Sequence, residues 1–262
     1  MKLFDLTGKR AVVVGGAGGI GQAIAQGFAE AGAIVMITSR NEESLKRAQN
    51  EIKTGSGVEI QYSVCDATDE LQVEALVKTA LEKIGGADIL LNAQGINIKH
   101  PGTEFPVEDW DKMFEANVKS LMLTIKHFGK YMKDNGVQGK IINIGSVRGV
   151  RAVGNGGLGN VGYCATKGAV EMLTKAYASD FGPDIQVNAI GPTLTYTPMM
   201  SQMSIIPKDE DERNARFAGA TPAKRIGYPE DCVGPAIFLA SAASDFVTGQ
   251  TIYPDGGLTA IG

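Results

Sequence analysis

The sequence predicts one α/β domain, built on a doubly wound parallel sheet with helices on both faces. Short apolar runs rich in β-branched residues recur along the chain, and stretches with helical periodicity separate them. These runs are apolar along their whole length, which indicates strands that are buried on both faces and therefore parallel. A length of 262 residues lies at the upper end of what one such domain holds. The predicted strands are Ala11–Val14, Ile34–Ile37, Ile89–Leu91, Ile141–Ile144 and Ile185–Ile190.

Two segments between the strands show the apolar spacing of helices that cover a sheet. Apolar residues repeat at intervals of three and four from Ile20 to Ala31, and again from Val73 to Ile84, where Asp69 supplies the N-cap. The stretch Met199–Ala220 breaks this rhythm, because its methionines give way to the charged run Lys208–Arg213. We predict a mobile surface excursion there.

Composition and charge favour a small-molecule partner over a macromolecular one. The 25 basic and 29 acidic residues, for a net charge of −4, are spread along the chain, so no basic stripe predicts binding to nucleic acid or lipid. No apolar run approaches the roughly 18 residues of a membrane span, and the N-terminus lacks a signal-peptide core. We therefore expect a cytoplasmic protein with reduced thiols and no metal site, since two histidines accompany three dispersed cysteines, Cys65, Cys164 and Cys232.

A glycine-rich segment follows the first predicted strand and opens the first predicted helix. Glycines let the backbone approach a pyrophosphate closely, and a helix N-terminus offers free N–H groups and a positive dipole end. The strand before and the helix after distinguish this segment from an ordinary tight turn, and they indicate a Rossmann-type dinucleotide site. The candidate cofactor contacts are Gly15, Gly18, Gly19, Ile20 and Gly21.

The end of the second strand bears on the choice of cofactor. An acidic side chain there would take the ribose hydroxyls of NAD, whereas a cation would take the 2′-phosphate of NADP. Ser39 and Arg40 occupy this position, so no carboxylate is present and an arginine is available. We predict that NADP(H) is preferred, with NAD(H) as the alternative if Arg40 is only a solvated residue at a helix start.

A tyrosine and a lysine four residues apart are candidate catalytic groups. Tyr163 and Lys167 fall on one face of a predicted helix, where an ammonium group can stabilise the tyrosine anion and allow proton transfer. Ser146 ends the strand Ile141–Ile144 and could hydrogen-bond a substrate oxygen. Each of these residues alone is weak evidence, because a packed tyrosine or a capping serine is common.

Together these motifs resemble the short-chain dehydrogenase/reductase family, from Leu6-Thr7-Gly8-Lys9 to Asp255-Gly256-Gly257. The family's glycine spacing is matched by Gly15-x-x-x-Gly19-x-Gly21, although Val14 stands where a threonine is usual. The resemblance implies a hydride exchange between a nicotinamide cofactor and an alcohol/carbonyl pair.

The family likeness also assigns roles to four residues of this chain. Tyr163 would take the hydroxyl proton, while Lys167 would hold the cofactor ribose and lower the tyrosine pKa. Ser146 would steady the substrate oxygen, and Asn117 would anchor a proton-relay water to the lysine. Ser146 and Tyr163 are 17 residues apart, where 12 to 14 is usual in the family, so we expect a bulged loop and a reshaped pocket rim.

Further cofactor contacts follow from the resemblance, position by position. Ala93 and Gln94 depart from the family's usual Asn-Asn-Ala-Gly, and Thr193 replaces the glycine of its Pro-Gly segment. The matched positions are Asp66 and Ala67 beside the adenine, Asn92, Ala93 and Gly95 after the predicted strand Ile89–Leu91, and Pro192, Thr195 and Thr197 near the nicotinamide.

The substrate is less clearly indicated. The chain is most similar to gluconate 5-dehydrogenases and related sugar-acid or polyol dehydrogenases, through Arg40–Leu45, Trp110-Asp111 and Thr166–Val170. A 3-oxoacyl-carrier-protein reductase is the enzymatic alternative, and a non-catalytic NAD(P)-binding regulatory protein is the alternative of another class. The candidate substrate contacts include the cations Lys99, Arg148 and Arg151, which either receive a carboxylate or are solvated loop charges. Met199 is a further candidate, which either lines an adaptable lid or simply packs it.

The resemblance further implies a chain with a cofactor-binding half and a substrate-binding half, and an oligomer of identical subunits. Residues 1–145 would form the cofactor half, and residues 146–262 would form the catalytic and substrate half, with a lid at 195–220. We expect a homotetramer, or a homodimer, in which a long helix at about Val107–Met132 and the helix near Tyr163 pack across a two-fold axis. The apolar surface for that contact would come from Leu121, Leu123, Ile125 and Phe128.

Overall fold

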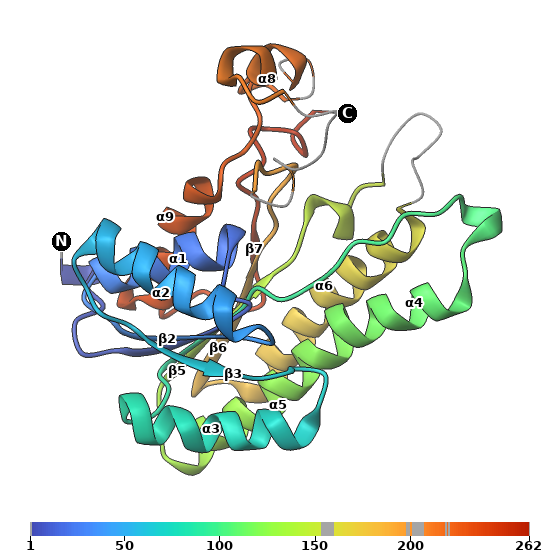
Figure 1. Cartoon of the computed structure of the whole chain (residues 1–262). Coiled ribbons are helices and arrows are strands. Elements are labelled where there is room, and N and C mark those ends of the chain that lie inside the picture. The colour runs from blue at the N-terminus through green and yellow to red at the C-terminus, as the bar shows by residue number, and fades with distance from the viewer. Residues whose placement is uncertain are drawn as a thin grey trace.

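Parallel strands form a single seven-stranded sheet, in the order β3-β2-β1-β4-β5-β6-β7, in the computed structural model (Figure 1). The structure describes residues 2–152, 160–197, 200, 207–217, 219 and 221–261. The strands are β1 (Arg10–Val14), β2 (Ile34–Ser39), β3 (Gln61–Val64), β4 (Ile89–Asn92), β5 (Gly139–Ile144), β6 (Ile185–Ile190) and β7 (Thr251–Ile252). The helices are α1 (Gly19–Glu30), α2 (Glu42–Ser56), α3 (Glu70–Ile84), α4 (Val107–Phe114), α5 (Ser120–Asp134), α6 (Val161–Phe181), α8 (Glu210–Phe217) and α9 (Val233–Ala240).

Helices cover both faces of the sheet, which confirms the predicted doubly wound α/β class. Helices α1, α2 and α9 lie on one face, and α3, α5 and α6 lie on the other (Figure 1). Val13 of β1 belongs to the first core and its neighbour Val12 to the second, because successive side chains of a strand point to opposite faces. Both valines are fully buried, so a strand in this position must be apolar throughout.

The strand order reverses at β1, which lies between β2 and β4. Val14 at the end of β1 pairs with Thr38 of β2 on one side and with Asn92 of β4 on the other. The two loops that leave β1 and β4 run close together, since a Cβ atom on Gly15 would lie 2.7 Å from the carbonyl carbon of Ala93. The crevice outside the carboxyl ends of the strands at such a reversal is where doubly wound folds bind their ligands.

The elements differ from the sequence-based expectations at four places. Strands β3 and β7 were not among the predicted apolar runs. The predicted helix at Val107–Met132 is instead α4 and α5 joined by a π-helical turn at Glu115–Lys119. Helix α6 begins at Val161, two residues before Tyr163.

The apolar residues that we expected at a subunit contact lie inside the protomer. Leu121 and Leu123 are 3% and 2% exposed, and Ile125 and Phe128 are fully buried, all in the core beneath α3, α5 and α6. These four side chains are therefore covered without a partner subunit, which removes our sequence argument for an assembly.

Arg213 is buried, although it lies in the stretch Met199–Ala220 that we predicted to be a surface excursion. Its side chain is 4% exposed, and the guanidinium carbon lies 3.8 Å from the centre of the Tyr196 ring. Its Nη2 also donates a hydrogen bond to the Tyr228 hydroxyl at 3.1 Å. Helix α8, which stands away from the sheet in Figure 1, is thus tied to the segments around Tyr196 and Tyr228.

None of the described helices is both long and apolar enough to cross a membrane. Likewise, no group of three or more His, Cys, Asp or Glu side chains in the described residues converges as a metal site would require.

Candidate active site

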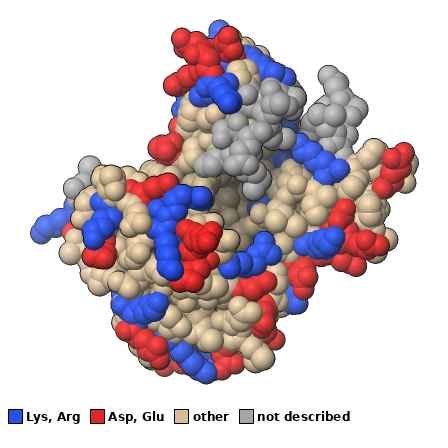
Figure 2. Space-filling view, viewed as in Figure 1, with Lys and Arg blue, Asp and Glu red and all other residues tan. Residues whose placement is uncertain are grey.

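Two adjoining cavities open at the carboxyl edge of the sheet, on either side of the loop that follows β4. The first has a volume of about 340 Å³ and contains the side chains after β5 and at the start of α6. The second has a volume of about 390 Å³ and lies over the ends of β1, β2 and β3. Figure 2 shows charges of both signs interspersed around a hollow on this face. The two cavities share Gly18, Ala93, Gln94, Gly95, Ile96 and Thr197 as a common wall.

The glycine loop between β1 and α1 forms one side of both cavities. Gly15 and Gly19 have φ angles of +79° and +54°, which L-residues with a side chain rarely adopt. The backbone N–H groups of Gly15 and Gly16 donate to the Thr38 carbonyl at 2.8 and 3.2 Å. The loop is therefore held by main-chain bonds to β2, even though Val14 lacks the threonine hydroxyl usual in the resembled family.

The second cavity contains the residues expected around an adenosine. Arg40 is exposed on its wall beside Ser39, and Asp66 and Ala67, which follow the neighbouring strand β3, line the same cavity. The Asp66 carboxylate accepts hydrogen bonds from the backbone N–H and the hydroxyl of Thr68, at 3.0 and 2.8 Å, which fixes the turn after β3. The charge on this wall is thus a cation at the end of β2 and a braced carboxylate after β3.

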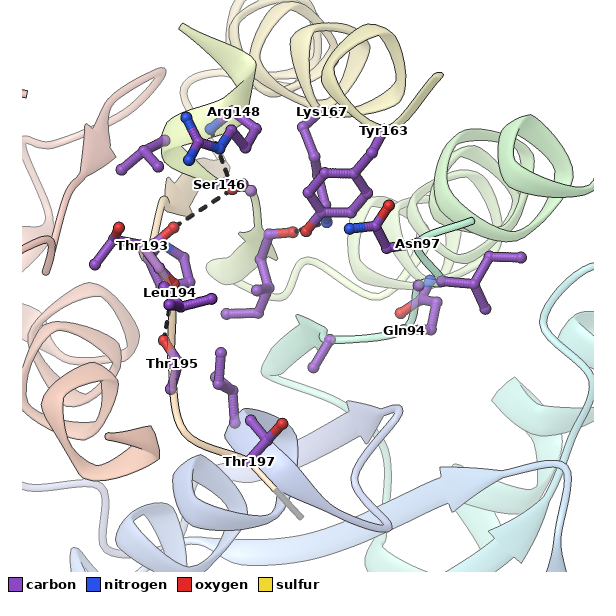
Figure 3. Close-up of a pocket in the computed structure, with 18 of the residues that line it drawn as sticks. Gln94, Asn97, Ser146, Arg148, Tyr163, Lys167, Thr193, Leu194, Thr195 and Thr197 are labelled. Carbon is purple, nitrogen blue, oxygen red and sulfur yellow. Dashed lines mark hydrogen bonds between the residues drawn. The ribbon is translucent and has the colours of Figure 1, made fainter. Parts of the chain in front are cut away.

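Tyr163 and Lys167 project from α6 into the first cavity, one helical turn apart (Figure 3). Lys167 is 4% exposed, and its Nζ lies 5.6 Å from the centre of the Tyr163 ring and donates to the Ile144 carbonyl at 2.7 Å. Burial lowers the pKa of Lys167 to about 8. Burial also raises the pKa of Tyr163, and the nearby Ser146 hydroxyl opposes this rise. The free protein therefore holds the phenol protonated beside an ammonium group that is easily neutralised.

Ser146 reaches the same cavity from the end of β5. Its hydroxyl donates to the Pro192 carbonyl at 3.4 Å and accepts from the Arg148 backbone N–H at 3.1 Å, as the dashed lines in Figure 3 show. The residue also N-caps a short 3₁₀ turn at Val147–Gly149. The spacing of 17 residues to Tyr163 does not prevent the two side chains from lining one cavity. The expected bulge falls partly on residues 153–159, which lie outside the described residues.

Asn117 and Asn92 lie behind the cavities rather than on their walls. The Asn117 side chain accepts from the Ile96 N–H at 2.7 Å, and its amide donates to the Ile96 carbonyl and to the Thr166 hydroxyl. Asn92 donates to Asn143 on the neighbouring strand at 3.0 Å and is 1% exposed. Both side chains hold the frame of the site in place, and neither residue lines the described walls of the two cavities.

The candidate substrate residues divide into two groups. Lys99 and Arg148 line the first cavity. Arg151 does not, because its guanidinium donates to the carbonyl oxygens of Leu258 and Ile261 in the C-terminal segment. Met199 lies outside the described residues, as does much of the expected lid at 195–220.

Some polar residues on the walls were not among the predicted site residues. Gln94 borders both cavities, and its Oε1 is buried with no hydrogen-bond partner in the described part of the chain. Asn97 faces the Tyr163 ring across the first cavity (Figure 3), and Asn160 precedes α6. Gln94 and Asn97 follow a predicted strand at its carboxyl end, so this position was the available signal for both.

The residues present fit a dinucleotide. Two cavities meet at the N-terminus of a 12-residue helix, where unpaired N–H groups suit a pyrophosphate. A Cβ atom on Gly18 would meet no protein atom within 4 Å, so this glycine keeps space open on the wall that both cavities share.

Comparisons with known proteins agree with this geometry. A family model described as Enoyl-(Acyl carrier protein) reductase matches residues 15–259. The gluconate 5-dehydrogenase of Gluconobacter oxydans is 38% identical over 98% of this chain and 97% of its own length. The crystal structure of a gluconate 5-dehydrogenase from Burkholderia cenocepacia in complex with NADP and tartrate is 36% identical, with a TM-score of 0.87 over 100% of this chain and 99% of that one.

A short-chain type dehydrogenase/reductase from Mycobacterium marinum shows the same fold, with 34% identity and a TM-score of 0.87 over 99% of this chain and 98% of that one. These matches extend over the whole domain, and the glycine loop, Ser146, Tyr163 and Lys167 occupy one edge of its sheet. The chain belongs to the short-chain dehydrogenase/reductase family of NAD(P)-dependent oxidoreductases.

Proposed function

We propose that this enzyme oxidises a secondary alcohol of a sugar acid, and reduces the corresponding ketone, with NADP(H) as its preferred cofactor. The observation that carries the substrate class is Arg148, a cation on the wall of the first cavity two residues from Ser146 and close enough to Tyr163 to act on its charge. A carboxylate held there keeps a neighbouring carbinol group within reach of Tyr163 and Ser146.

The side chains of this site divide the acid–base work. When bound, the nicotinamide cofactor accepts the hydride during oxidation and supplies it during reduction. Tyr163 removes the hydroxyl proton of the alcohol, or returns it to the ketone oxygen, and Ser146 holds that oxygen by a hydrogen bond. Lys167 holds the cofactor ribose, and its positive charge favours the Tyr163 anion.

Asn117 supports this work indirectly. Its amide is fully engaged with Ile96 and Thr166, so we propose that it fixes the loop after β4 that carries Gly95 and Asn97. The expectation that Asn117 anchors a proton-relay water to Lys167 stays a prediction.

Support for NADP(H) comes from the second cavity. Arg40 stands exposed at the end of β2, where a 2′-phosphate would lie, and Ser39 leaves this position without a carboxylate. The related Burkholderia enzyme is in complex with NADP. The remaining cofactor contacts that we propose are Gly15, Gly18, Gly19, Ile20, Gly21, Asp66, Ala67, Ala93, Gly95, Pro192, Thr195 and Thr197.

The sugar-acid proposal agrees with the gluconate 5-dehydrogenases that this chain resembles. A non-catalytic role is disfavoured because all four residues expected for catalysis are present. We also propose that residues 1–145 mainly bind the cofactor and that residues 146–262 mainly bind the substrate.

The decisive experiment measures NADP⁺ reduction with D-gluconate and with the neutral polyol D-sorbitol. We expect gluconate to be the better substrate for the wild type. Arg148→Gln should lower kcat/KM for gluconate by about 10- to 150-fold, because a hydrogen bond between charged groups contributes roughly 1.5–3 kcal/mol.

Two further measurements complete this test. The value for sorbitol should change little in Arg148→Gln, and Arg151→Gln serves as the matched control because its side chain binds the C-terminal segment. An equal loss for both substrates in Arg148→Gln would assign Arg148 to the loop rather than to a carboxylate.

We infer in addition a homotetramer or homodimer in the cytoplasm. The outer surface of α5 and α6 carries a groove of about 360 Å³ lined by Met122, Lys126, Tyr177 and Phe181, which suits contact with a second copy. All three cysteines are free, as in a reducing compartment. Light scattering at micromolar concentration should give a multiple of 27.6 kDa, and a mass equal to one chain would exclude the assembly.

A further inference from the structure

Glu171 is a buried acid on the catalytic face of α6 that the proposed reaction does not use. It follows Lys167 by four residues and Tyr163 by eight, so the three side chains lie along one face of the helix. Glu171 is 7% exposed, and Lys167 is 4% exposed. A carboxylate is rarely buried without a compensating charge or several hydrogen bonds, so its partners need an explanation.

Only one of the two carboxylate oxygens of Glu171 accepts a hydrogen bond from a described residue. Its Oε2 accepts from the Thr251 hydroxyl of β7 at 2.6 Å. Its Oε1 is buried, with no hydrogen-bond partner in the described residues. Tyr253 lies beside the carboxylate, and burial together with the Glu171 charge raises the pKa of that phenol to about 12. Neither neighbour supplies a positive charge.

Lys167 is the cation on the same side of the helix. Its Nζ lies 2.7 Å from the carbonyl oxygen of Ile144, and a Cβ atom on Gly145 would lie 3.2 Å from Glu171 Oε1. The ammonium and the carboxylate therefore approach neighbouring residues of the backbone where β5 ends. A Cβ atom on Gly149 would lie 2.8 Å from Glu171 Cγ, so the segment that carries Ser146 rests directly on this acid.

We propose that Glu171 is a positioning residue whose buried carboxylate keeps Lys167 in its charged form and thereby sets the upper pH limit of cofactor binding. The inference rests on the proposed role of Lys167 at the cofactor ribose. Burial alone would drive the proton off Lys167, and the charge of Glu171 opposes this effect.

Other ionisable groups near Lys167 and Glu171 come from several elements. Tyr163 shares the helix, Arg148 faces Tyr163 from the 3₁₀ turn, and Tyr253 and Asp255 follow β7. From the π-helical turn, the packed residue Asn117 is neutral, while Lys119 and Glu115 pair with each other at 3.0 Å. Arg148 is the other cation of this group, and its charge acts on Tyr163.

The test is the Kd for NADPH, measured by calorimetry between pH 6 and pH 9 in the wild type, Glu171→Gln, Glu171→Asp and Thr251→Val. In the wild type we expect binding to weaken above about pH 8, where Lys167 loses its proton. Glu171→Gln should move this transition down by about one pH unit, so that Kd at pH 8 is about fivefold weaker while Kd at pH 6 is unchanged.

The conservative variants separate charge from structure. Glu171→Asp keeps the charge and should restore most of the wild-type profile, even if Glu171→Gln folds poorly. Thr251→Val removes a hydrogen bond to Glu171 but no charge, so it should leave the transition in place. A wild-type profile without any transition, matching Lys167→Met, would refute the role of Lys167. A transition present in the wild type and unmoved in Glu171→Gln would overturn the present inference alone.

Discussion

Replacing Ser39 with Asp and Arg40 with Ile together should reverse the cofactor preference. Arg40 is exposed at the second cavity, and the Ser39 hydroxyl beside it donates to the Asn41 carbonyl at 3.3 Å. A charge-assisted hydrogen bond from Arg40 to a 2′-phosphate contributes roughly 1.5–3 kcal/mol, which is about 10- to 150-fold in affinity. A carboxylate at position 39 would add repulsion toward that phosphate and an acceptor for the ribose hydroxyls of NAD.

Calorimetric titration of wild type and double variant with NADPH and NADH gives the four Kd values needed. The wild type should bind NADPH tighter by one to two orders of magnitude, and the variant should bind NADH tighter. Arg47→Ile is the matched control, because Arg47 is an exposed arginine like Arg40 but lies within α2, with its Nε 3.9 Å from Glu51 Oε1, and the described walls of both cavities do not include it. Equal wild-type affinities, or tighter NADH, would show that Arg40 does not bind the phosphate.

Three further predictions concern catalysis, charge and the glycine loop. Tyr163→Phe should lower turnover by at least 10²–10⁴-fold with cofactor Kd nearly unchanged, and near-normal turnover would exclude Tyr163 as the proton acceptor. Burial lowers the pKa of Lys167 to about 8 from its ordinary 10.5. Below pH 8 the buried ammonium therefore lowers the free energy of unfolding by roughly 3 kcal/mol, and this penalty disappears as the pH rises from 8 to 10.5. Lys167→Met should therefore be stabilised relative to the wild type at pH 7 and less so at pH 10, whereas a pH-independent difference in Tm would contradict this. Gly18→Ala should keep the wild-type Tm but weaken NADPH binding, while Gly21→Ala should lower Tm as well, because its Cβ would lie 2.3 Å from the Gly15 carbonyl oxygen.

Hydrophobic patterning was sufficient for the central strands and insufficient at the edges of the sheet. Strands β1, β4 and β5 are covered by helices on both sides, so each contains a run of consecutive apolar residues that is recognisable in the sequence. Strand β3 is an edge strand with the sequence Gln-Tyr-Ser-Val and no buried residue, and its place is set by pairing with β2. Strand β7 has two residues, too few for any periodicity to appear.

The site residues that belong to a sequence motif could be predicted. Residues whose role depends on the direction of the side chain could not. Tyr163, Lys167 and Ser146 line one cavity because the carboxyl end of β5 and the start of α6 meet there. Arg148 and Arg151 are three residues apart and equally charged in sequence, yet one lines the cavity and the other holds the C-terminal segment. The 3₁₀ turn at Val147–Gly149 separates their directions, and nothing in the pattern of charges reveals such a turn.

The departures from the family pattern fall where the backbone, rather than the side chain, makes the structural contact. Val14 replaces a threonine, but its carbonyl accepts from the Ala93 N–H at 2.8 Å, and the adjoining glycines bond to β2 through their own N–H groups. Ala93 replaces an asparagine and still contributes that N–H to the junction of the two loops. Thr193 replaces a glycine, and its carbonyl accepts from the Thr195 hydroxyl at 3.0 Å. Because the bond between Val14 and Ala93 needs only a main chain that follows the same course, these two substitutions change which side chains line the cavities and leave the junction of the two loops in place.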